Sequence, residues 1–434
     1  MLVLTVIQQR HCELNFPRNL NIFDTAQFVS TKTAATSRYA LCYVNDFIDY
    51  VYNIKIPNIS VAVNFGIKFE FTMCDIKISN INIPDISIML NNDEVVLNLI
   101  NIDLEMTSLW NIRQQSYPYS NDDGQLNIIV KNANMQTILK STVDQNSCPG
   151  HIIVENLFAR AEYESLKIQL EGGNGFLLQS VINIIIDLIQ DDISKTVKQI
   201  VVDQVVALIN TVFEDGRIQK PYLNYENIIK DARYTSGVQI GNGYLSLLQS
   251  GYTYEKFNLQ DEYMKRQYLN EKYITLNKFN GDIQFGVHVE CFNNIYYIFH
   301  KYNNLYSTQM YQVTIAPQMV FMNTVAYIKI QVIINQSIVD VELLGTPIYD
   351  DRRDIEVGTL YFIYQQYQAA SLDVNIDLLQ IQKMVVDQMN FVSKNSGFQF
   401  SYTHLVDIRK MQYSIDPVEQ IIRLIGDIPS GCGK

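Results

Sequence analysis

The sequence has few of the features that mark catalytic or metal-binding proteins. Its 434 residues contain no HExxH motif, no GxSxG motif and no CxxC pair, and the five histidines are scattered. His288-Val289-Glu290 matches the first half of a zinc deaminase signature, but no PCxxC follows it. An esterase would need a nucleophile beside a base, and no such motif is found. We therefore predict a non-enzymatic protein with no catalytic residue, metal site or cofactor.

Charge and long hydrophobic runs are also scarce. Only 18% of the residues are charged, and the net charge is −12. The first 215 residues hold 14 Lys and Arg against 24 Asp and Glu, a net charge of −10 that leaves −2 for the rest. Nucleic acid is therefore excluded as a partner. No run reaches the ~18 apolar residues of a membrane span. The apolar start of seven residues is too short for a standard signal peptide.

Apolar residues make up 47% of the chain, and between about 55 and 170 they recur at every second position. Such alternation is typical of half-buried strands. Clusters of Asn, Asp, Gly and Pro separate the runs, as expected for antiparallel hairpins. The alternating sets are Ile59, Val61, Val63 and Phe65; Ile67, Phe69, Phe71 and Met73; and Ile100, Ile102, Leu104 and Met106.

A helical period follows from about 176 to 213, where apolar residues fall three or four apart on one stripe. A helix of ~38 residues would be ~57 Å long at 1.5 Å per residue. A coiled coil would explain the stripe, but the one-sided sheet just before it is the preferred partner. The stripe consists of Leu178, Ile182, Ile185, Ile189, Ile193, Val197, Val201, Val205, Leu208 and Val212.

The second half repeats this order in shorter form. Strands are predicted at 283–289, 326–334, 338–344 and 355–363, then a helix at 372–392, and then β-like segments at 398–404 and 408–415. Strands followed by a long helix, occurring twice, suggest two related domains. We predict an N-terminal domain over 1–215, a linker over 216–243 and a C-terminal domain over 244–434.

Several segments carry a resemblance to a known family. They are KIPNISVAVNFGIKFEFTMCDIKISNINIP (55–84), the helical stretch from 175 to 213, YTSGVQIGNGYLSLLQSGYTY (234–254), GDIQFGVHVECFNNIYYIFHKYN (281–303) and the closing segment 397–428. In this order they resemble the two-domain lipid-binding family of bactericidal/permeability-increasing protein, lipopolysaccharide-binding protein and the plasma lipid transfer proteins.

The resemblance implies an α+β boomerang of two elongated barrels, each a twisted antiparallel sheet wrapped on a long amphipathic helix, joined by a central sheet. It implies apolar tunnels for phospholipid or another acyl lipid, transient contact with membrane surfaces, and a secreted or lumenal location. The chain departs from the family in two ways. Cys148 has no cysteine partner on the 176–213 helix, and the first half is acidic where antibacterial members are basic.

The predicted lipid-binding residues are the apolar faces of one helix and two strands. The alternatives are a surface or lumenal interaction protein of the same fold with filled pockets, and a lipopolysaccharide binder of the innate-immunity type. An apolar stripe can also simply pack as core. The predicted residues are Ile182, Ile185, Ile189 and Ile193 on the helix, with Phe69, Phe71, Ile100 and Ile102 on the strands.

Overall fold

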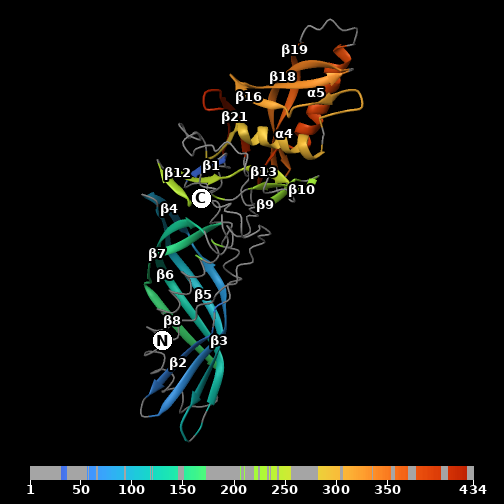
Figure 1. Cartoon of the computed structure of the whole chain (residues 1–434). Helices are drawn as coiled ribbons and strands as arrows, with labels where there is room; N and C mark the ends of the chain where they lie inside the picture. Colours follow the sequence, from blue (N-terminus) through green and yellow to red (C-terminus); the bar gives the residue numbers. More distant parts are fainter. Residues whose placement is uncertain are drawn as a thin grey trace. The chain divides into compact units, whose positions relative to one another are not determined.

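The computed structural model is mostly β-sheet. Two helices, α4 and α5, lie within the part of the chain that it describes (Figure 1). No helix in that part is both long and apolar enough to cross a membrane. The described residues are 31–36, 56, 58–64, 67–91, 94–117, 119, 121–144, 151–172, 206, 210, 219–222, 225–231, 234, 236–241, 244–255, 282–303, 306–334, 336–352, 357–369, 378–401 and 409–427.

The chain divides into two compact units. The N-terminal unit comprises Ala40–Lys140, Val154–Val212 and Gly433–Lys434, and the C-terminal unit comprises Met1–Tyr39, Ser141–Ile153 and Phe213–Cys432. The predicted domain limits at 215 and 243 remain predictions.

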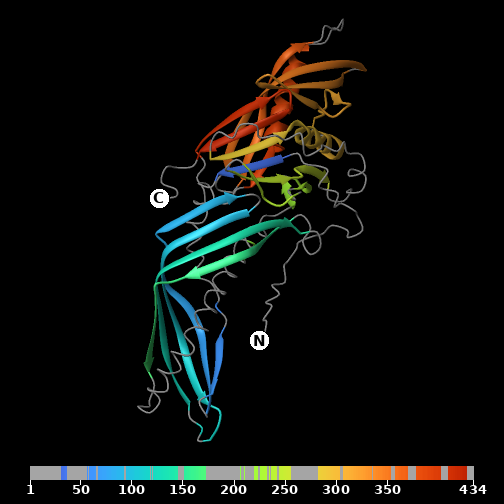
Figure 2. The ribbon, with the colours of Figure 1, turned by 90° about the vertical axis from the view of Figure 1, so that its left-hand side faces the viewer.

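A seven-stranded antiparallel sheet forms the N-terminal unit. Its strand order is β2-β3-β5-β6-β7, with β4 also paired to β5 and β8 to β6. The alternating pattern therefore predicts the strands correctly, and Figure 2 shows that this sheet bends sharply part-way along them. The strands are β2 (Ile59–Asn64), β3 (Lys68–Asn82), β4 (Asp85–Asn91), β5 (Glu94–Gln114), β6 (Asn121–Val143), β7 (Ile152–Glu162) and β8 (Ser165–Gly172).

One six-stranded sheet of the C-terminal unit collects strands from distant parts of the chain, in the order β11-β12-β1-β14-β22-β21. The sequence pattern missed β1, which inserts between β12 and β14. The strands are β1 (Thr31–Thr36), β11 (Gln239–Gly241), β12 (Tyr244–Gln249), β14 (Ile283–His288), β21 (Arg409–Asp416) and β22 (Ile421–Asp427).

Two further sheets complete the C-terminal unit. One has the order β15-β17-β18-β19-β20, with β16 also paired to β17, and the other has the order β13-β10-β9. The strands are β9 (Gln219–Tyr222), β10 (Tyr225–Asp231), β13 (Tyr252–Glu255), β15 (Gln312–Val313), β16 (Gln318–Met322), β17 (Val325–Ile334), β18 (Ser337–Arg352), β19 (Val357–Ala369) and β20 (Phe398–Ser401).

Helices α4 (Val289–Asn303) and α5 (Leu378–Asn395) belong to the same unit. The sequence predicts α5 but not α4, whose VECFNNIYYIFHKYN is rich in residues of modest helix propensity. Of the long helix predicted over 176–213, the described residues Val206 and Asn210 are helical, and the rest lies outside the described residues.

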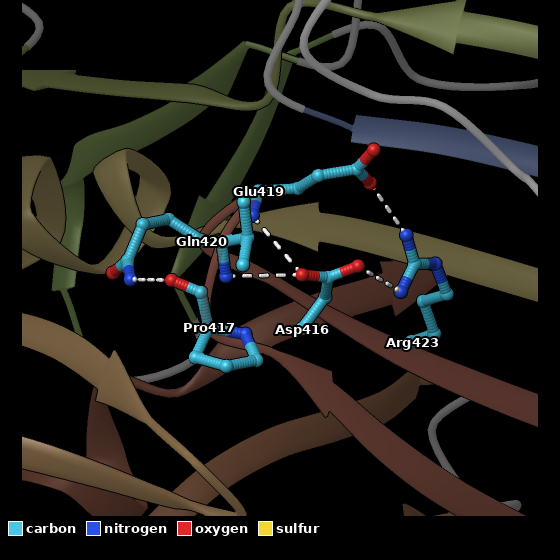
Figure 3. Close-up of polar contacts among 6 residues, drawn as sticks. Asp416, Pro417, Glu419, Gln420 and Arg423 are labelled. Atoms are coloured by element: carbon cyan, nitrogen blue, oxygen red, sulfur yellow. Dashed lines mark hydrogen bonds and ion pairs between the residues drawn. The ribbon is translucent and has the colours of Figure 1, made fainter.

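Side-chain amides close the free edge of β16. The Asn293 amide accepts a hydrogen bond from the Met319 N–H (2.7 Å) and donates one to its carbonyl (3.2 Å). Gln420 does the same for Phe321, at 2.8 and 3.0 Å. Figure 3 shows Gln420 in the β21–β22 turn, where its Nε2 also donates to the Pro417 carbonyl. These amides bind backbone groups at the edge of β16 that a neighbouring strand would otherwise bind. An unpaired edge invites such pairing, so the amides protect it.

The same arrangement holds helical residues to two other strands. Asn390 of α5 bonds the N–H and the carbonyl of Tyr364 on β19, at 2.6 and 3.1 Å. In the N-terminal unit, Asn210 bonds both backbone groups of Val154 on β7, at 2.7 and 2.9 Å. Bidentate asparagines therefore fix helical residues to strands in both units: Asn293 and Asn390 in the C-terminal unit and Asn210 in the N-terminal unit.

Candidate functional site

The strands of the N-terminal sheet are interrupted along one line, here called the kink line, which passes through Pro84, Asn101, Asn132 and Glu164. Pro84 separates β3 from β4, both of which pair with β5, and Glu164 separates β7 from β8. Asn101 and Asn132 have positive φ angles of 58° and 50°. The pairing register of β5 with β6 shifts beside Ile102. Because bulges bend strands, the kink line accounts for the bend of the sheet.

Polar side chains stabilise the kink line on the outer face of the sheet. The Asn101 N–H donates to Asn134 Oδ1 and the Asn132 N–H to Asp103 Oδ1, both at 3.1 Å. The Asn132 amide also donates to the Glu164 carboxylate. These bonds satisfy backbone groups that the bulges remove from the ladder.

The bulges also keep apolar side chains on one face, here called the inner face. On β5 the residues of the inner apolar clusters are odd before the kink line, at Leu97 and Leu99, and even after it, at Ile102 and Leu104, although Val96 is buried as well. In an uninterrupted strand, odd and even positions face opposite sides of the sheet. Without the bulge, the side chains before and after the kink line would therefore lie on different faces. The inner face is therefore apolar on both sides of the bend.

On one side of the kink line the inner face is a closely packed cluster, here called the first panel. Trp110, the single tryptophan, is buried in it and stacks on Phe71 with 6.4 Å between ring centroids. The buried members are Ile59, Phe69, Phe71, Met73, Ile76, Ile78, Leu104, Met106, Trp110, Ile112, Leu126, Ile128 and Val130.

On the other side lies the second panel, which is less completely covered. Its buried members are Leu97, Leu99, Ile102 and Met135. A larger set of apolar side chains packs around these four and keeps part of its surface exposed. This set is Ile81, Ile83, Ile86, Ile88, Ala133, Ala159 and Ala161.

The predicted site residues on the strands fall in different places. Phe69 and Phe71 belong to the first panel, and Ile102 to the second. The assignment of Ile100 to the same face as Ile102 is wrong, because the bulge at Asn101 lies between them and Ile100 is 39% exposed. Contact of these residues with lipid remains a prediction. The predicted helical site residues Ile182, Ile185, Ile189 and Ile193 lie outside the described residues.

An open hollow of about 700 Å³ follows the kink line. It is mostly polar, and a hydrogen bond from the Asn132 N–H lowers the pKa of Asp103 within it. Sequence reasoning missed this feature, although adjacent Leu99 and Ile100 break the alternation and signal it. The lining residues are Asn82, Pro84, Asn101, Asp103, Asn132, Asn134, Glu162, Tyr163 and Glu164. Among the described residues, no group of three His, Cys, Asp or Glu could hold a metal ion.

The C-terminal unit differs, because its largest apolar cluster is filled by side chains. Phe292 of α4 contacts the rings of Phe321, Phe362 and Phe398 with centroids 5.1–6.3 Å apart. The hydroxyls of Tyr296 and Tyr364 hydrogen-bond each other inside this cluster. Side chains at this density leave no room for an acyl chain among these rings.

Comparison with known proteins places the fold. No protein-family model matches the sequence, and no curated protein sequence matches it. Among solved structures, the chain is similar to lipopolysaccharide binding protein, with a TM-score of 0.52 at 12% identity over 93% of this chain and 99% of that one. The resemblance stated from the sequence is thus confirmed for the fold.

Takeout 1 of Epiphyas postvittana also matches, with a TM-score of 0.26 at 12% identity, over 36% of this chain and 78% of that one. A score this low has no bearing on the fold of the present chain.

Proposed function

We propose that the protein binds acyl lipids on the inner face of the N-terminal sheet, with the acyl chains against the second panel. The partly exposed apolar side chains around Leu97, Leu99, Ile102 and Met135 carry this proposal. A hydrocarbon ligand that covers this partly exposed apolar surface removes it from water, which is favourable. The neighbour of the same fold is named for binding lipopolysaccharide, which has acyl chains.

The energetics suit a carrier. Each buried methylene contributes about 0.8 kcal/mol relative to water, so two ordinary acyl chains gain roughly 25 kcal/mol in gross terms. Leaving a bilayer costs a similar amount. The exchange is therefore nearly balanced, and we propose that the protein loads and releases phospholipid or a similar lipid without chemical turnover.

The proposal includes the finer architecture implied by the family resemblance. A long amphipathic helix over 176–213 would cover the inner face and bring Ile182, Ile185, Ile189 and Ile193 to the lipid. Two elongated barrels joined by a central sheet would form the boomerang. A secreted or lumenal location belongs to the same proposal, since such carriers exchange lipid between membranes or lipid particles.

Transient membrane contact has a candidate in the loop between β5 and β6. Tyr117 and Tyr119 are 86% and 75% exposed, and their rings meet edge to face with centroids 6.4 Å apart. Tyrosine rings favour the membrane–water interface because they are apolar with a polar tip. We propose that this loop touches the donor or acceptor membrane.

The alternative with filled pockets applies to the C-terminal unit. Phe292, Phe321, Phe362 and Phe398 pack against one another in the buried cluster of that unit, which favours the alternative there. That cluster therefore suits a structural or protein-binding role, and the proposed acyl site is assigned to the N-terminal unit.

Enlarging a small side chain in the second panel tests the proposal. Ala161→Phe should fill space around the buried members of the second panel and reduce the phosphatidylcholine acquired from vesicles at least several-fold. The matched control Ile100→Phe enlarges an exposed side chain on the outer face and should leave uptake unchanged. Native mass spectrometry with lipid extraction measures the bound lipid. Equal uptake by both variants and the original chain would rule out the second panel as the site.

A further inference from the structure

The hollow along the kink line plays no part in the proposed acyl site. It crosses the sheet from the end of β3, over β5 and β6, to the turn between β7 and β8. Neighbouring strands lie about 4.8 Å apart, so the three spacings between β3 and β7 give it a length of roughly 14 Å. Its volume of about 700 Å³ is within the range of ligand sites in proteins. The hollow therefore has room for a ligand of more than one ring.

Three asparagines in the hollow are held in place by the bulges and still have polar atoms to offer. The side-chain nitrogen of Asn101 donates to Asp85 Oδ2 at 3.3 Å, and that of Asn132 donates to the Glu164 carboxylate. These bonds leave the Oδ1 atoms of both asparagines as acceptors. Asn134 is the reverse, because its Oδ1 accepts the Asn101 N–H and its NH₂ group remains as a donor. Side chains that are fixed in advance lose little conformational freedom when a ligand binds.

Asn82 adds a second donor. It is the last residue of β3 and pairs with Asp103 in the register. Its side chain is exposed, lines the hollow and makes no hydrogen bond to any residue in the described part of the chain. The lining thus provides amide donors on β3 and β6 and amide acceptors on β5 and β6.

The carboxylates around the hollow are already engaged. Asp103 accepts the Asn132 N–H and pairs with Lys131, both at 3.1 Å. Glu162 pairs with Arg160 at 2.5 Å. Five carboxylates against two cations still leave a net charge of −3, which disfavours an anionic ligand. The carboxylates are Asp85, Asp103, Glu105, Glu162 and Glu164, and the cations are Lys131 and Arg160.

The polar groups that remain in the hollow suit hydroxyls. A hydroxyl donates one hydrogen bond and accepts others, so neighbouring hydroxyls of one molecule can bind amide oxygens and amide N–H groups at the same time. A cation would have to compete with Lys131 and Arg160 for the carboxylates, and the described residues offer no three-ligand group for a metal ion. Pro84 and Tyr163 supply an apolar part of the lining, against which the C–H groups of a sugar ring can pack.

We propose that the hollow binds a neutral saccharide of two or more sugar units. Its hydroxyls donate to Oδ1 of Asn101 and Asn132 and accept from the amides of Asn82 and Asn134. The saccharide belongs either to a glycan or to the headgroup of a glycolipid. The polar side chains of the kink line lie on the outer face of the sheet, whereas the acyl site lies on the inner face. The inference therefore goes beyond the proposed function and does not depend on it.

Asn134→Asp tests the inference without removing the bulge. An aspartate keeps the oxygen that accepts the Asn101 N–H, but it replaces the NH₂ donor with a second acceptor. The probes are maltotriose, mannotriose and galactotriose, titrated by saturation-transfer NMR, and phosphatidylcholine vesicles with and without digalactosyldiacylglycerol. We expect Asn134→Asp and Asn82→Ala each to weaken the binding of the recognised saccharide at least ~10-fold.

Two variants outside the hollow are the matched controls. Asn121→Asp makes the same change at the exposed start of β6, and Asn91→Ala removes an amide at the exposed end of β4. Neither residue lines the hollow, so both variants should bind as the original chain does. All four variants should unfold at the same urea concentration as the original chain, so a loss of binding reports on the hollow.

The vesicles distinguish the two sources of the saccharide. Binding of a free trisaccharide indicates a glycan. Binding to vesicles with digalactosyl headgroups alone, lost in Asn134→Asp and absent with pure phosphatidylcholine, indicates a glycolipid headgroup. Either result supports the inference.

Three results would overturn it. They are no binding of any saccharide probe to the original chain, equal binding by the original chain and both hollow variants, and tighter binding of the cationic probe spermidine than of any saccharide. Phosphatidylcholine uptake that is sensitive to Ala161→Phe would still support the acyl site in each case. Saccharide binding without phosphatidylcholine uptake would in turn support the hollow and contradict the acyl site.

Discussion

At the scale of single residues, His288 shows how burial and capping act together. Its Nδ1 accepts a hydrogen bond from the N–H of Glu290 in the first turn of α4, at 3.2 Å. Burial lowers the pKa of His288 to about 4. Protonation would both charge a buried ring and remove the acceptor that caps the helix. The neutral imidazole is therefore part of the folded structure at ordinary pH.

The lowered pKa predicts a pH dependence of stability. Above pH 6.5 His288 is neutral in both the folded and unfolded states, and between 6.5 and about 4 only the unfolded state takes up the proton. Its contribution is thus lost as pH falls, by about 1 kcal/mol between pH 7.5 and 5.5. His288→Asn keeps an acceptor for the helix cap but does not titrate. Its free energy of unfolding in urea should therefore fall by about 1 kcal/mol less over the same pH range. An identical pH dependence in both proteins would contradict the assignment.

At the scale of elements, a bulge decides which face of the sheet a side chain takes, and the bonds at its edge decide whether a strand is left unpaired. The alternation of apolar residues predicts β3, β5 and β6, because alternation is a local property of half-buried strands. It did not predict the change of face at Asn101, which depends on the bulge. Nor did it predict β1, since pairing of residues 31–36 with β12 and β14 is non-local.

Helix α4 shows a second limit of local patterns. Its residues include Val289, Phe292, Ile295 and several tyrosines, which suit strands as well as helices. Tertiary packing decides between them, since Phe292, Ile295 and Phe299 are buried in the aromatic cluster. The sequence also did not predict how much of the second panel is exposed, because that depends on which distant segments of the chain cover it.

The bulge at Asn101 has a direct test. A β-branched residue is strained at a φ of 58°, whereas glycine is not. Asn101→Val should lower the free energy of unfolding by about 1–3 kcal/mol, and Asn101→Gly by less. Fluorescence of Trp110, which lies in the same unit, follows the urea transition. Thr107→Val, at an exposed position on β5, is the control. Equal stability of the two valine variants would mean that the bulge is not required.

The edge of β16 offers another test at this scale. Asn293→Ala removes both side-chain bonds to Met319 and leaves a buried N–H and carbonyl without them. We expect a loss of about 2–3 kcal/mol in stability by urea unfolding followed by circular dichroism. Asn395→Ala removes a solvent-exposed hydrogen bond to the Phe391 carbonyl on α5 and should cost less than about 1 kcal/mol. A loss at Asn293 no larger than at Asn395 would show that water replaces the amide.

At the scale of the whole molecule, the two units are built differently. The N-terminal unit presents an apolar inner face whose second panel is partly covered, whereas the main cluster of the C-terminal unit is filled by aromatic rings. The family resemblance predicted the fold from ordered segments spanning most of the chain. It did not predict this asymmetry, since the degree of filling depends on which side chains meet.

The central claim is that an acyl chain lies against the second panel. Phosphatidylcholine with a photoreactive diazirine on its acyl chain, loaded from vesicles and irradiated, marks the side chains that the hydrocarbon touches. Peptide mapping should place the adducts on the inner face of β4 and β7, at Ile86, Ile88, Ala159 and Ala161. Adducts confined to the outer face, at Met89 and Phe158, or no adduct in these strands, would contradict the account.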